Sequence, residues 1–160
     1  MQWTVDEVFT AYGDRIFAAA FSVCRNRADA DDVVQDALVR YYTHPREFES
    51  KDHLKAWLLR VAINRARDVS TSFWRKHTVA WEEYMNDLPF EEPQDSRLFE
   101  AVMRLPAKYR AVLHLFYYEG YAVAEIAHIL HRPAGTVKSQ LNRGWALLKT
   151  TLQEEWNDDE

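Results

Sequence analysis

A row of hydrogen-bonding side chains runs along one predicted helix in the last third of the sequence. The residues recur three or four positions apart and carry hydroxyl, amide or guanidinium groups: Thr136, Ser139, Gln140 and Arg143, with Lys138 and Asn142 beside them. Such groups can hydrogen-bond to base edges when their helix lies in the major groove of DNA. The spacing therefore predicts a surface that recognises duplex DNA.

The surrounding segment, residues 122–149, is predicted to form two short helices with a tight corner between them. Pro133 breaks the helical pattern at the corner, and Gly120 is a plausible cap for the helix before it. The apolar face of the second helix is predicted to comprise Val137, Leu141, Trp145 and Leu148. Residues 132–149 contain four basic and no acidic residues, although the chain has a net charge of −5. This contrast indicates a polyanionic partner. The alternative is an amphipathic hairpin in an ordinary helical bundle.

A cluster of aspartates opens an earlier helix, which is predicted to begin at residues 26–30 and to end near Tyr42. Three interpretations are open: a solvated acidic face favoured by the helix dipole, a docking surface for a basic protein, or a metal site. The metal site is the least favoured, because hard cations need more oxygen ligands than one helix offers and no histidine joins the cluster. The aspartates are Asp29, Asp31, Asp32 and Asp36.

A third predicted helix, residues 53–75, carries a basic stripe. Between residues 54 and 77 there are six basic residues against Asp68 alone, and Phe73 and Trp74 lie among them. Cations can follow a nucleic-acid backbone while aromatic rings stack on unpaired bases, so the stripe is typical of single-stranded DNA binding. The alternative is a solvated helix with a core tryptophan, which we favour for Trp57. The outer face is predicted to present Arg60, Asn64, Arg67, Asp68, Thr71 and Arg75.

These helices indicate an all-α protein with two small helical domains. Residues 1–77 would form a three-to-four-helix bundle, residues 78–95 an acidic linker, and residues 96–156 a helix-turn-helix domain. Thr4 and Glu7 form a capping box for the first helix, whose apolar stripe is predicted to include Phe9. A later helix is predicted to bury Phe116 and Tyr117, and the acidic tail from Glu154 is expected to fray.

The composition excludes several classes of function. The chain of 160 residues has one cysteine, Cys24, so no intramolecular disulfide can form. It has no apolar run of membrane-spanning length and no signal-peptide layout, so a cytoplasmic protein is expected. It has no nucleophile with a paired base, no glycine-rich phosphate loop and no Cys/His metal spacing. We therefore expect neither an enzyme nor a bound metal or cofactor.

Taken together, the segments resemble the extracytoplasmic-function (ECF) sigma factors, bacterial initiation factors with sigma regions two and four only. NRADADDVVQDALVRYY and HLKAWLLRVAINRARD resemble region two. RLPAKYRAVLHLFYYEGYAVAEIAHIL followed by RPAGTVKS resembles region four. The resemblance covers most of the chain, and it implies a factor that binds core RNA polymerase and directs promoter-specific initiation.

The resemblance also implies roles for individual residues. The acidic helix would dock on the clamp helices of the polymerase β′ subunit through Asp31, Asp32, Gln35 and Asp36. The third helix and loop 46–52 would bind the melted minus-ten strand and hold a flipped base, through Phe48, Arg60, Asn64, Arg67 and Asp68. The last helix would read the minus-thirty-five element, through Arg132, Thr136, Lys138, Ser139, Gln140 and Arg143. Region four would also dock on the β flap, and an anti-sigma factor is a further partner that the family allows.

Three other hypotheses remain open. A stand-alone helix-turn-helix regulator with a helical N-terminal domain would bind duplex DNA without polymerase. A helical metal-dependent hydrolase would use the cluster from Asp29 to Asp36. A protein-binding member that has lost DNA function is compatible with Gly144, Trp145 and Ala146, which stand where the family often has basic residues.

Overall fold

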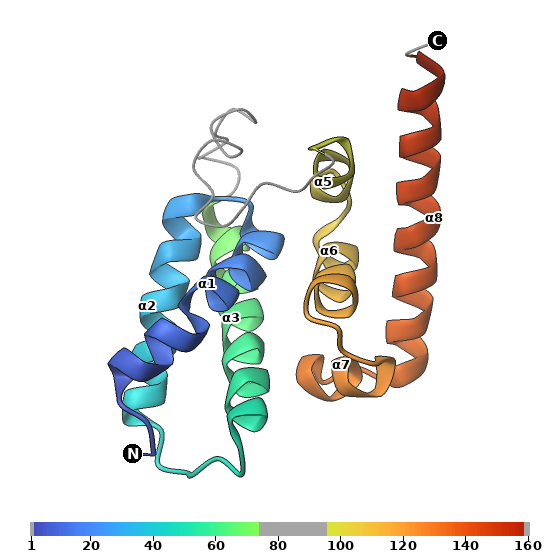
Figure 1. The fold of residues 1–160 in the computed structure, drawn as a ribbon. Coiled ribbons are helices and arrows are strands. Elements are labelled where there is room, and N and C mark those ends of the chain that lie inside the picture. Colours follow the sequence, from blue (N-terminus) through green and yellow to red (C-terminus); the bar gives the residue numbers. More distant parts are fainter. Residues whose placement is uncertain (1, 74–95, 159–160) are drawn as a thin grey trace. The chain divides into compact units, whose positions relative to one another are not determined.

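The computed structural model describes residues 2–73 and 96–158, and the chain divides into two compact units, Met1–Phe90 and Glu91–Glu160 (Figure 1). All regular elements among the described residues are helices, which confirms the all-α prediction. The predicted linker, residues 78–95, and the predicted end of the third helix at Arg75 lie outside these residues. No helix in the described ranges is long and apolar enough to cross a membrane.

The first unit is built from α1 (Val5–Cys24), α2 (Arg27–Thr43) and α3 (Lys51–Phe73), each of which packs against the other two (Figure 1). The helices meet through fully buried aliphatic and aromatic side chains, which remove apolar surface from water. The largest of these are Phe21, Ile16, Leu54, Leu58, Leu59, Ile63, Val8 and Val33.

Local capping fixes where these helices begin and end. The predicted capping box is confirmed: the Glu7 amide donates to Thr4 Oγ1 at 3.1 Å, and the Thr4 amide donates to Glu7 Oε2 at 2.9 Å. Asn26 caps α2 by accepting a hydrogen bond from the Asp29 amide at 2.9 Å. These contacts satisfy backbone amides that have no partner inside the helix.

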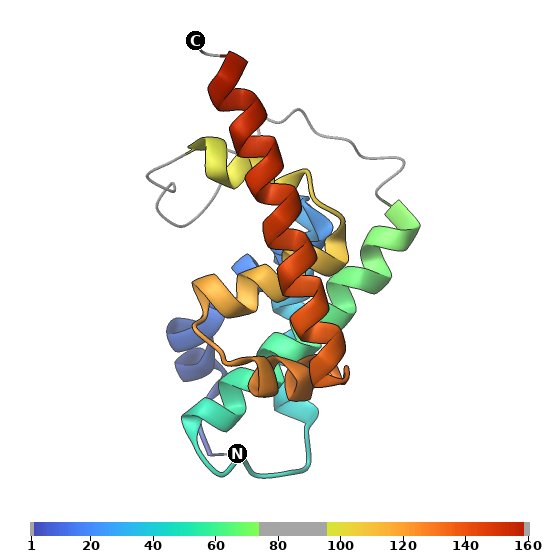
Figure 2. The ribbon, with the colours of Figure 1, turned by 90° about the vertical axis from the view of Figure 1, so that its right-hand side faces the viewer.

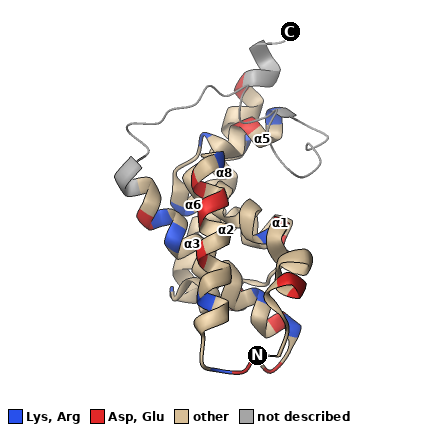
Figure 3. Cartoon of the chain, turned by 90° about the vertical axis from the view of Figure 1, so that its left-hand side faces the viewer, with Lys and Arg blue, Asp and Glu red and all other residues tan. Residues whose placement is uncertain are grey.

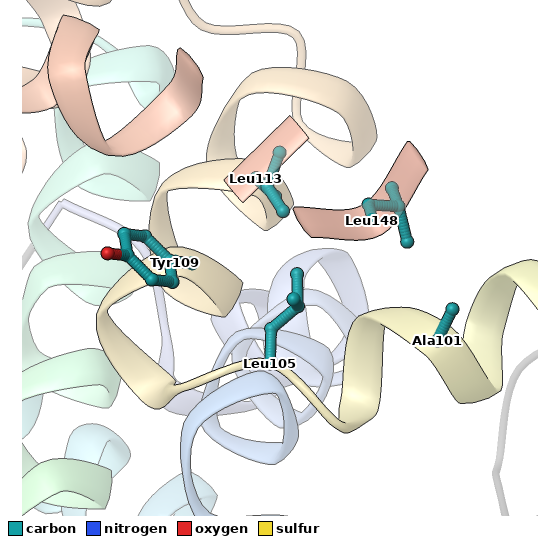
Figure 4. Packing of buried hydrophobic residues seen from close by; sticks show 5 residues of the cluster. All are labelled: Ala101, Leu105, Tyr109, Leu113 and Leu148. Carbon is teal, nitrogen blue, oxygen red and sulfur yellow. The ribbon is translucent and has the colours of Figure 1, made fainter. Parts of the chain in front are cut away.

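The second unit comprises α5 (Ser96–Met103), α6 (Ala107–Leu113), the π-helical turn η1 (His114–Tyr118), α7 (Val123–Leu130) and α8 (Ala134–Asp158). Helix α8 packs against α5, α6 and α7. Part of its core is a cluster of side chains from α5, α6, α8 and the turn after α5, shown in Figure 4: Ala101, Leu105, Tyr109, Leu113 and Leu148.

Three aromatic residues that the sequence predicted to be buried are exposed. Phe9 is 53% exposed and lies over Gly13, where a Cβ would sit 3.1 Å from the Phe9 ring. Tyr117 is 63% exposed, and Phe116 beside it is also exposed. Phe116 and Tyr117 lie in the wider π-helical turn η1, where the Glu119 amide donates to the His114 carbonyl five residues back. This turn contains one residue more than an α-helical turn, which changes which side chains face inward.

The predicted packing of α8 also needs correction. Trp145 is 48% exposed, and Gly144 is buried beside it. A Cβ on Gly144 would lie 3.2 Å from the Tyr109 Cβ, so α8 approaches α6 closely at this glycine. The helix continues to Asp158 and so includes most of the acidic tail from Glu154.

Candidate nucleic-acid interface

The acidic face of α2 (Asp31, Asp32, Gln35 and Asp36) lies opposite the side that packs into the core. Asp31, Asp32 and Gln35 are exposed, and Asp36 is partly exposed. The Asp36 carboxylate forms an ion pair with Arg65 of α3, with a distance of 2.8 Å between Oδ2 and Nε. Asp31 lies 3.9 Å from Nε of Arg27 one turn earlier. Asp32 therefore presents its charge outward without a comparable short ion pair among the described contacts.

Two exposed apolar side chains extend this acidic face along α2. Val39 is 61% exposed and Tyr42 is 66% exposed, and both follow Gln35 at helical spacing. Neither residue was predicted from the sequence to belong to a site. The available signal was that an apolar residue stood on the side of the helix that carries the aspartates. A large exposed apolar group beside charged ones is typical of a protein-binding surface.

The basic face of α3 (Arg60, Asn64, Arg67 and Asp68) is formed by residues that recur at helical spacing, and Lys and Arg positions recur along the helix (Figure 3). Asn64, Arg67 and Asp68 are exposed. The Arg67 guanidinium donates to Asn64 Oδ1 at 2.9 Å, which holds the two side chains together. Partial burial lowers the pKa of the Arg60 guanidinium from its ordinary value.

Phe48, in the loop between α2 and α3 (residues 44–50, here the α2–α3 loop), is placed differently from the basic face. Its side chain is only 5% exposed. Its ring lies against four other rings, with centroid distances from 5.3 to 6.1 Å: Tyr41, His44, His53 and Trp57. Phe48 thus anchors the loop, while Arg46, Glu47, Glu49 and Ser50 are exposed. Trp57 is partly buried in the same cluster.

Five of the six residues of the recognition face (Arg132, Thr136, Lys138, Ser139, Gln140 and Arg143) lie on α8, and Arg132 lies in the turn between α7 and α8, whose backbone Figure 2 shows. His131 ends α7 in the left-handed conformation, with φ 52°, and its amide donates to the Ala127 carbonyl. Pro133 precedes the first turn of α8, where its missing N–H costs no hydrogen bond. The Arg132 guanidinium then donates to Gln140 Oε1 at 2.9 Å, linking the turn to the helix.

An open hollow of about 330 Å³ lies beside this face. It is lined by four of the predicted residues and by three others: Thr136, Ser139, Gln140 and Arg143, with Lys108, Tyr109 and Gly135. Lys108 comes from the first turn of α6, and its Nζ lies 5.1 Å from the centre of the Tyr109 ring. Lys108 could not be predicted from the sequence, because α6 and α8 come together only in the folded unit. Lys138 does not line the hollow.

Exposed aromatic residues form a patch on η1 and α8 (Phe116, Tyr117 and Trp145). The Phe116 and Tyr117 ring centres are 4.9 Å apart, and those of Tyr117 and Trp145 are 6.2 Å apart. This aromatic patch has the composition that protein–protein interfaces favour. Within residues 2–73 and 96–158, no group of three or more His, Cys, Asp or Glu side chains could hold a metal ion.

Comparison with known proteins gives the class of the protein. The family model for Sigma-70 region 2 matches residues 8–78, and that for Sigma-70 region 4 matches residues 96–148. The ECF RNA polymerase sigma factor SigW of Bacillus subtilis is 26% identical over 165 residues, which cover 92% of this chain and 88% of SigW. SigL of Mycobacterium tuberculosis, also an ECF sigma factor, is 33% identical over 143 residues, covering 84% of this chain and 81% of SigL.

Solved structures show the same fold. The sigma factor RpoE from Bartonella quintana, in complex with the anti-sigma factor NepR, gives a TM-score of 0.70 at 24% identity, covering 92% of this chain and 96% of RpoE. CnrH, in complex with the cytosolic domain of CnrY, gives 0.67 at 25% identity, covering 94% of this chain and 88% of CnrH. The helices described above thus have the fold of a sigma-70-type factor. The chain belongs to the ECF RNA polymerase sigma factor family, whose members are transcription factors without an enzymatic role, and it acts in promoter-specific transcription initiation.

Proposed function

We propose that two domains share the binding of polymerase and promoter DNA. They are a region-two domain, residues 1–77, and a region-four domain, residues 96–156, joined by residues 78–95. The first would dock on core RNA polymerase and hold the melted minus-ten strand, and the second would bind the minus-thirty-five element. The family matches to residues 8–78 and 96–148 support this division. The observation that carries the proposal is the segregation of charge in the first unit, where acidic groups face outward on α2 and basic groups on α3.

The acidic face of α2, extended by Val39 and Tyr42, is the surface that we assign to the β′ clamp helices. Of these carboxylates, that of Asp32 would contribute most to the free energy of docking. The Asp36 carboxylate already forms an ion pair with Arg65 at 2.8 Å and must share or leave that partner when the surface docks. The exposed side chains of Val39 and Tyr42 would supply apolar contact area beside the charged pairs. Opposite charges would steer the encounter and fix its register, while the apolar groups would stabilise the complex.

The basic face of α3 and the α2–α3 loop are assigned to the melted minus-ten strand. Arg60 and Arg67 would contact phosphates, and Asn64 and Asp68 offer groups that can hydrogen-bond to an unpaired base. Because the Phe48 ring is buried, we propose that it maintains the shape of the loop and does not stack on a base. The exposed polar residues of the loop would then surround the base.

The recognition face is assigned to the minus-thirty-five element, with Lys108 as an added phosphate contact. The hollow that Lys108 shares with Thr136, Ser139, Gln140 and Arg143 would lie beside the DNA backbone when α8 enters the major groove. The aromatic patch on η1 and α8 is assigned to the β flap, since its exposed rings suit a protein partner better than a phosphate backbone.

An anti-sigma factor is a further partner that we propose, because the similar RpoE was crystallised with the anti-sigma factor NepR. Binding to core polymerase would place the protein in the bacterial cytoplasm. Neither role requires a cofactor or a metal ion.

A pull-down with core RNA polymerase tests the docking assignment. The variant Asp32→Arg reverses one outward charge on the acidic face, and Asp14→Arg makes the same charge change at an exposed position on α1. We expect Asp32→Arg to reduce core binding at least tenfold, because like charges now meet and a favourable pair is lost. Asp14→Arg should bind as the unmodified chain does. Equal binding by both variants would refute the docking surface, and duplex binding without polymerase would favour a stand-alone regulator.

A further inference from the structure

The backbone of the α2–α3 loop has no regular structure and is fixed by side chains. The Arg46 amide donates to His44 Nδ1 at 3.3 Å, and the Glu49 amide donates to His53 Nδ1 at 3.1 Å. Ser50 Oγ accepts from the His53 amide at 3.1 Å and so starts α3. These contacts are local, because each joins residues at most four positions apart. They shape the loop without tying it to the rest of the unit.

Gln2 provides a long-range tie at the centre of this loop. The Phe48 amide donates to Gln2 Oε1 at 2.5 Å, and Gln2 Nε2 donates to the Phe48 carbonyl at 2.7 Å. One side-chain amide thus satisfies both hydrogen-bonding groups of a single residue, 46 positions away in the chain. Since each bond restricts the other, the pair fixes the orientation of Phe48 better than one bond could.

Tyr41 at the end of α2 holds Gln2 in place. Its hydroxyl donates to the Trp3 carbonyl at 2.6 Å and accepts from the Trp3 amide at 3.1 Å. The Tyr41 ring also lies 6.1 Å from the Phe48 ring, centre to centre. Tyr41, Trp3, Gln2 and Phe48 therefore form a closed set of contacts that joins α2 to the loop.

We propose that Gln2 is a positioning residue for minus-ten recognition, which it serves by clamping the α2–α3 loop in the shape that receives the unpaired base. The inference rests on the function proposed above for this loop. Gln2 itself does not touch the DNA. Its effect passes through the Phe48 backbone to the exposed side chains on either side, Glu47 and Glu49.

Four versions of the full chain test the clamp, each with any affinity tag at the C-terminal side: unmodified, Gln2→Ala, Gln2→Glu and Thr4→Ala. Gln2→Ala removes both hydrogen bonds. Gln2→Glu keeps the size but replaces the donor with a carboxylate that faces the Phe48 carbonyl. Thr4→Ala is the matched control, because it breaks the capping box of α1 two residues away and leaves the loop contacts intact.

The first measurement is hydrogen exchange of the peptide that covers residues 44–50. We expect faster exchange in both Gln2 variants and unchanged exchange in Thr4→Ala. In Gln2→Ala the Phe48 amide loses its acceptor, and in Gln2→Glu the Phe48 carbonyl beside it loses its donor, whereas Thr4→Ala keeps both bonds. Unchanged exchange in Gln2→Ala would show that the clamp does not form, and would overturn the proposal whatever the protein does with DNA.

The second measurement is open-complex formation with core polymerase on a promoter found by run-off transcription of genomic fragments. Permanganate reactivity of minus-ten thymines should fall about tenfold in both Gln2 variants, which corresponds to the loss of one to two partly exposed hydrogen bonds. Core binding should be unchanged. Reactivity equal to that of the unmodified chain, or an equal fall in Thr4→Ala, would overturn the inference. If the unmodified chain itself directed no initiation on any fragment, the proposed function would fail and this inference with it.

Discussion

Several side chains assigned to DNA are already hydrogen-bonded to each other in the free chain. Arg67 donates to Asn64 on the basic face, and Arg132 donates to Gln140 on the recognition face. Each bond restricts a long, flexible side chain in the free protein. The entropy lost when such a side chain is ordered on binding is therefore smaller. The same bond must open or become shared if Gln140 is to read a base edge.

His114 makes the stability of the second unit depend on pH. Burial lowers its pKa from the ordinary value of 6.5 to about 4, and the buried Nε2 has no hydrogen-bond partner among the described residues. The unfolded chain therefore binds a proton first as the pH falls. The stability that the neutral ring provides is complete above about pH 6.5 and is lost progressively toward pH 4. Part of the residue reaches the surface, so we expect a loss of about 1–3 kcal/mol.

Denaturant unfolding at pH 7, 5.5 and 4.5 measures this effect. His114→Phe keeps a ring that can stack on Tyr118, whose centre lies 4.8 Å away, and removes the titrating group. We expect its stability to fall less than that of the unmodified chain over this range. His128→Phe, which replaces an exposed histidine on α7, is the control and should retain the full pH dependence. The same pH dependence in both variants would contradict the prediction.

At the scale of the elements, the turn of the helix-turn-helix contains a strained residue. His131 has a φ of 52°, in the left-handed region that costs a residue with a Cβ about 1–2 kcal/mol. Glycine adopts this conformation without that cost and is the usual residue at such a helix end. We expect His131→Gly to raise the free energy of unfolding of the second unit by about 1 kcal/mol in urea titrations.

His128→Gly is the matched control for this substitution, since it places the same residue within the regular part of α7. It should lower the free energy of unfolding by about 0.5–1 kcal/mol. A loss of stability in His131→Gly would mean that the imidazole makes a contact worth more than the relieved strain.

Most helices could be predicted from the sequence, because their starts and ends are set by nearby residues. The capping box at Thr4 and the corner at Pro133 are local signals, and both were interpreted correctly. The positive φ of Gly120, 77°, agrees with its predicted place after a helix. The outward acidic face of α2 was likewise predictable, because a single helix periodicity places Asp32 and Asp36 opposite Ala30 and Ala37.

The remaining features depend on contacts between distant parts of the chain or on departures from regular geometry. The extra residue of η1 moves Tyr117 to the surface, and no α-helical periodicity would predict that shift. Gly144 is buried where α8 packs closely against Tyr109 and Leu113 of α6, although a glycine adds nothing to an apolar pattern. The contacts of Gln2 with Phe48 and of Lys108 with the recognition face join residues that are far apart in sequence.

Across the whole molecule, the net charge is negative, and the positive charges are concentrated in a few segments. The chain has a net charge of −5, yet residues 132–149 contain four basic and no acidic residues. An acidic protein is repelled by DNA at a distance, so its binding depends on a few cations held at the contact surface. Loss of one such cation should therefore be measurable as a change in salt dependence.

The salt dependence of promoter binding by the complex with core polymerase tests this argument. Each phosphate that a cation neutralises contributes about 0.9 to the slope of log affinity against log salt concentration. We expect Arg143→Gln and Lys108→Gln each to make the slope shallower by about 0.9, and the double variant by about 1.8, because both side chains line the same hollow. Arg15→Gln, which removes an exposed cation on α1 of the first unit, should leave the slope unchanged. If Lys108→Gln behaved like Arg15→Gln while Arg143→Gln changed the slope, the hollow would not hold a phosphate, and duplex contacts would be confined to α8.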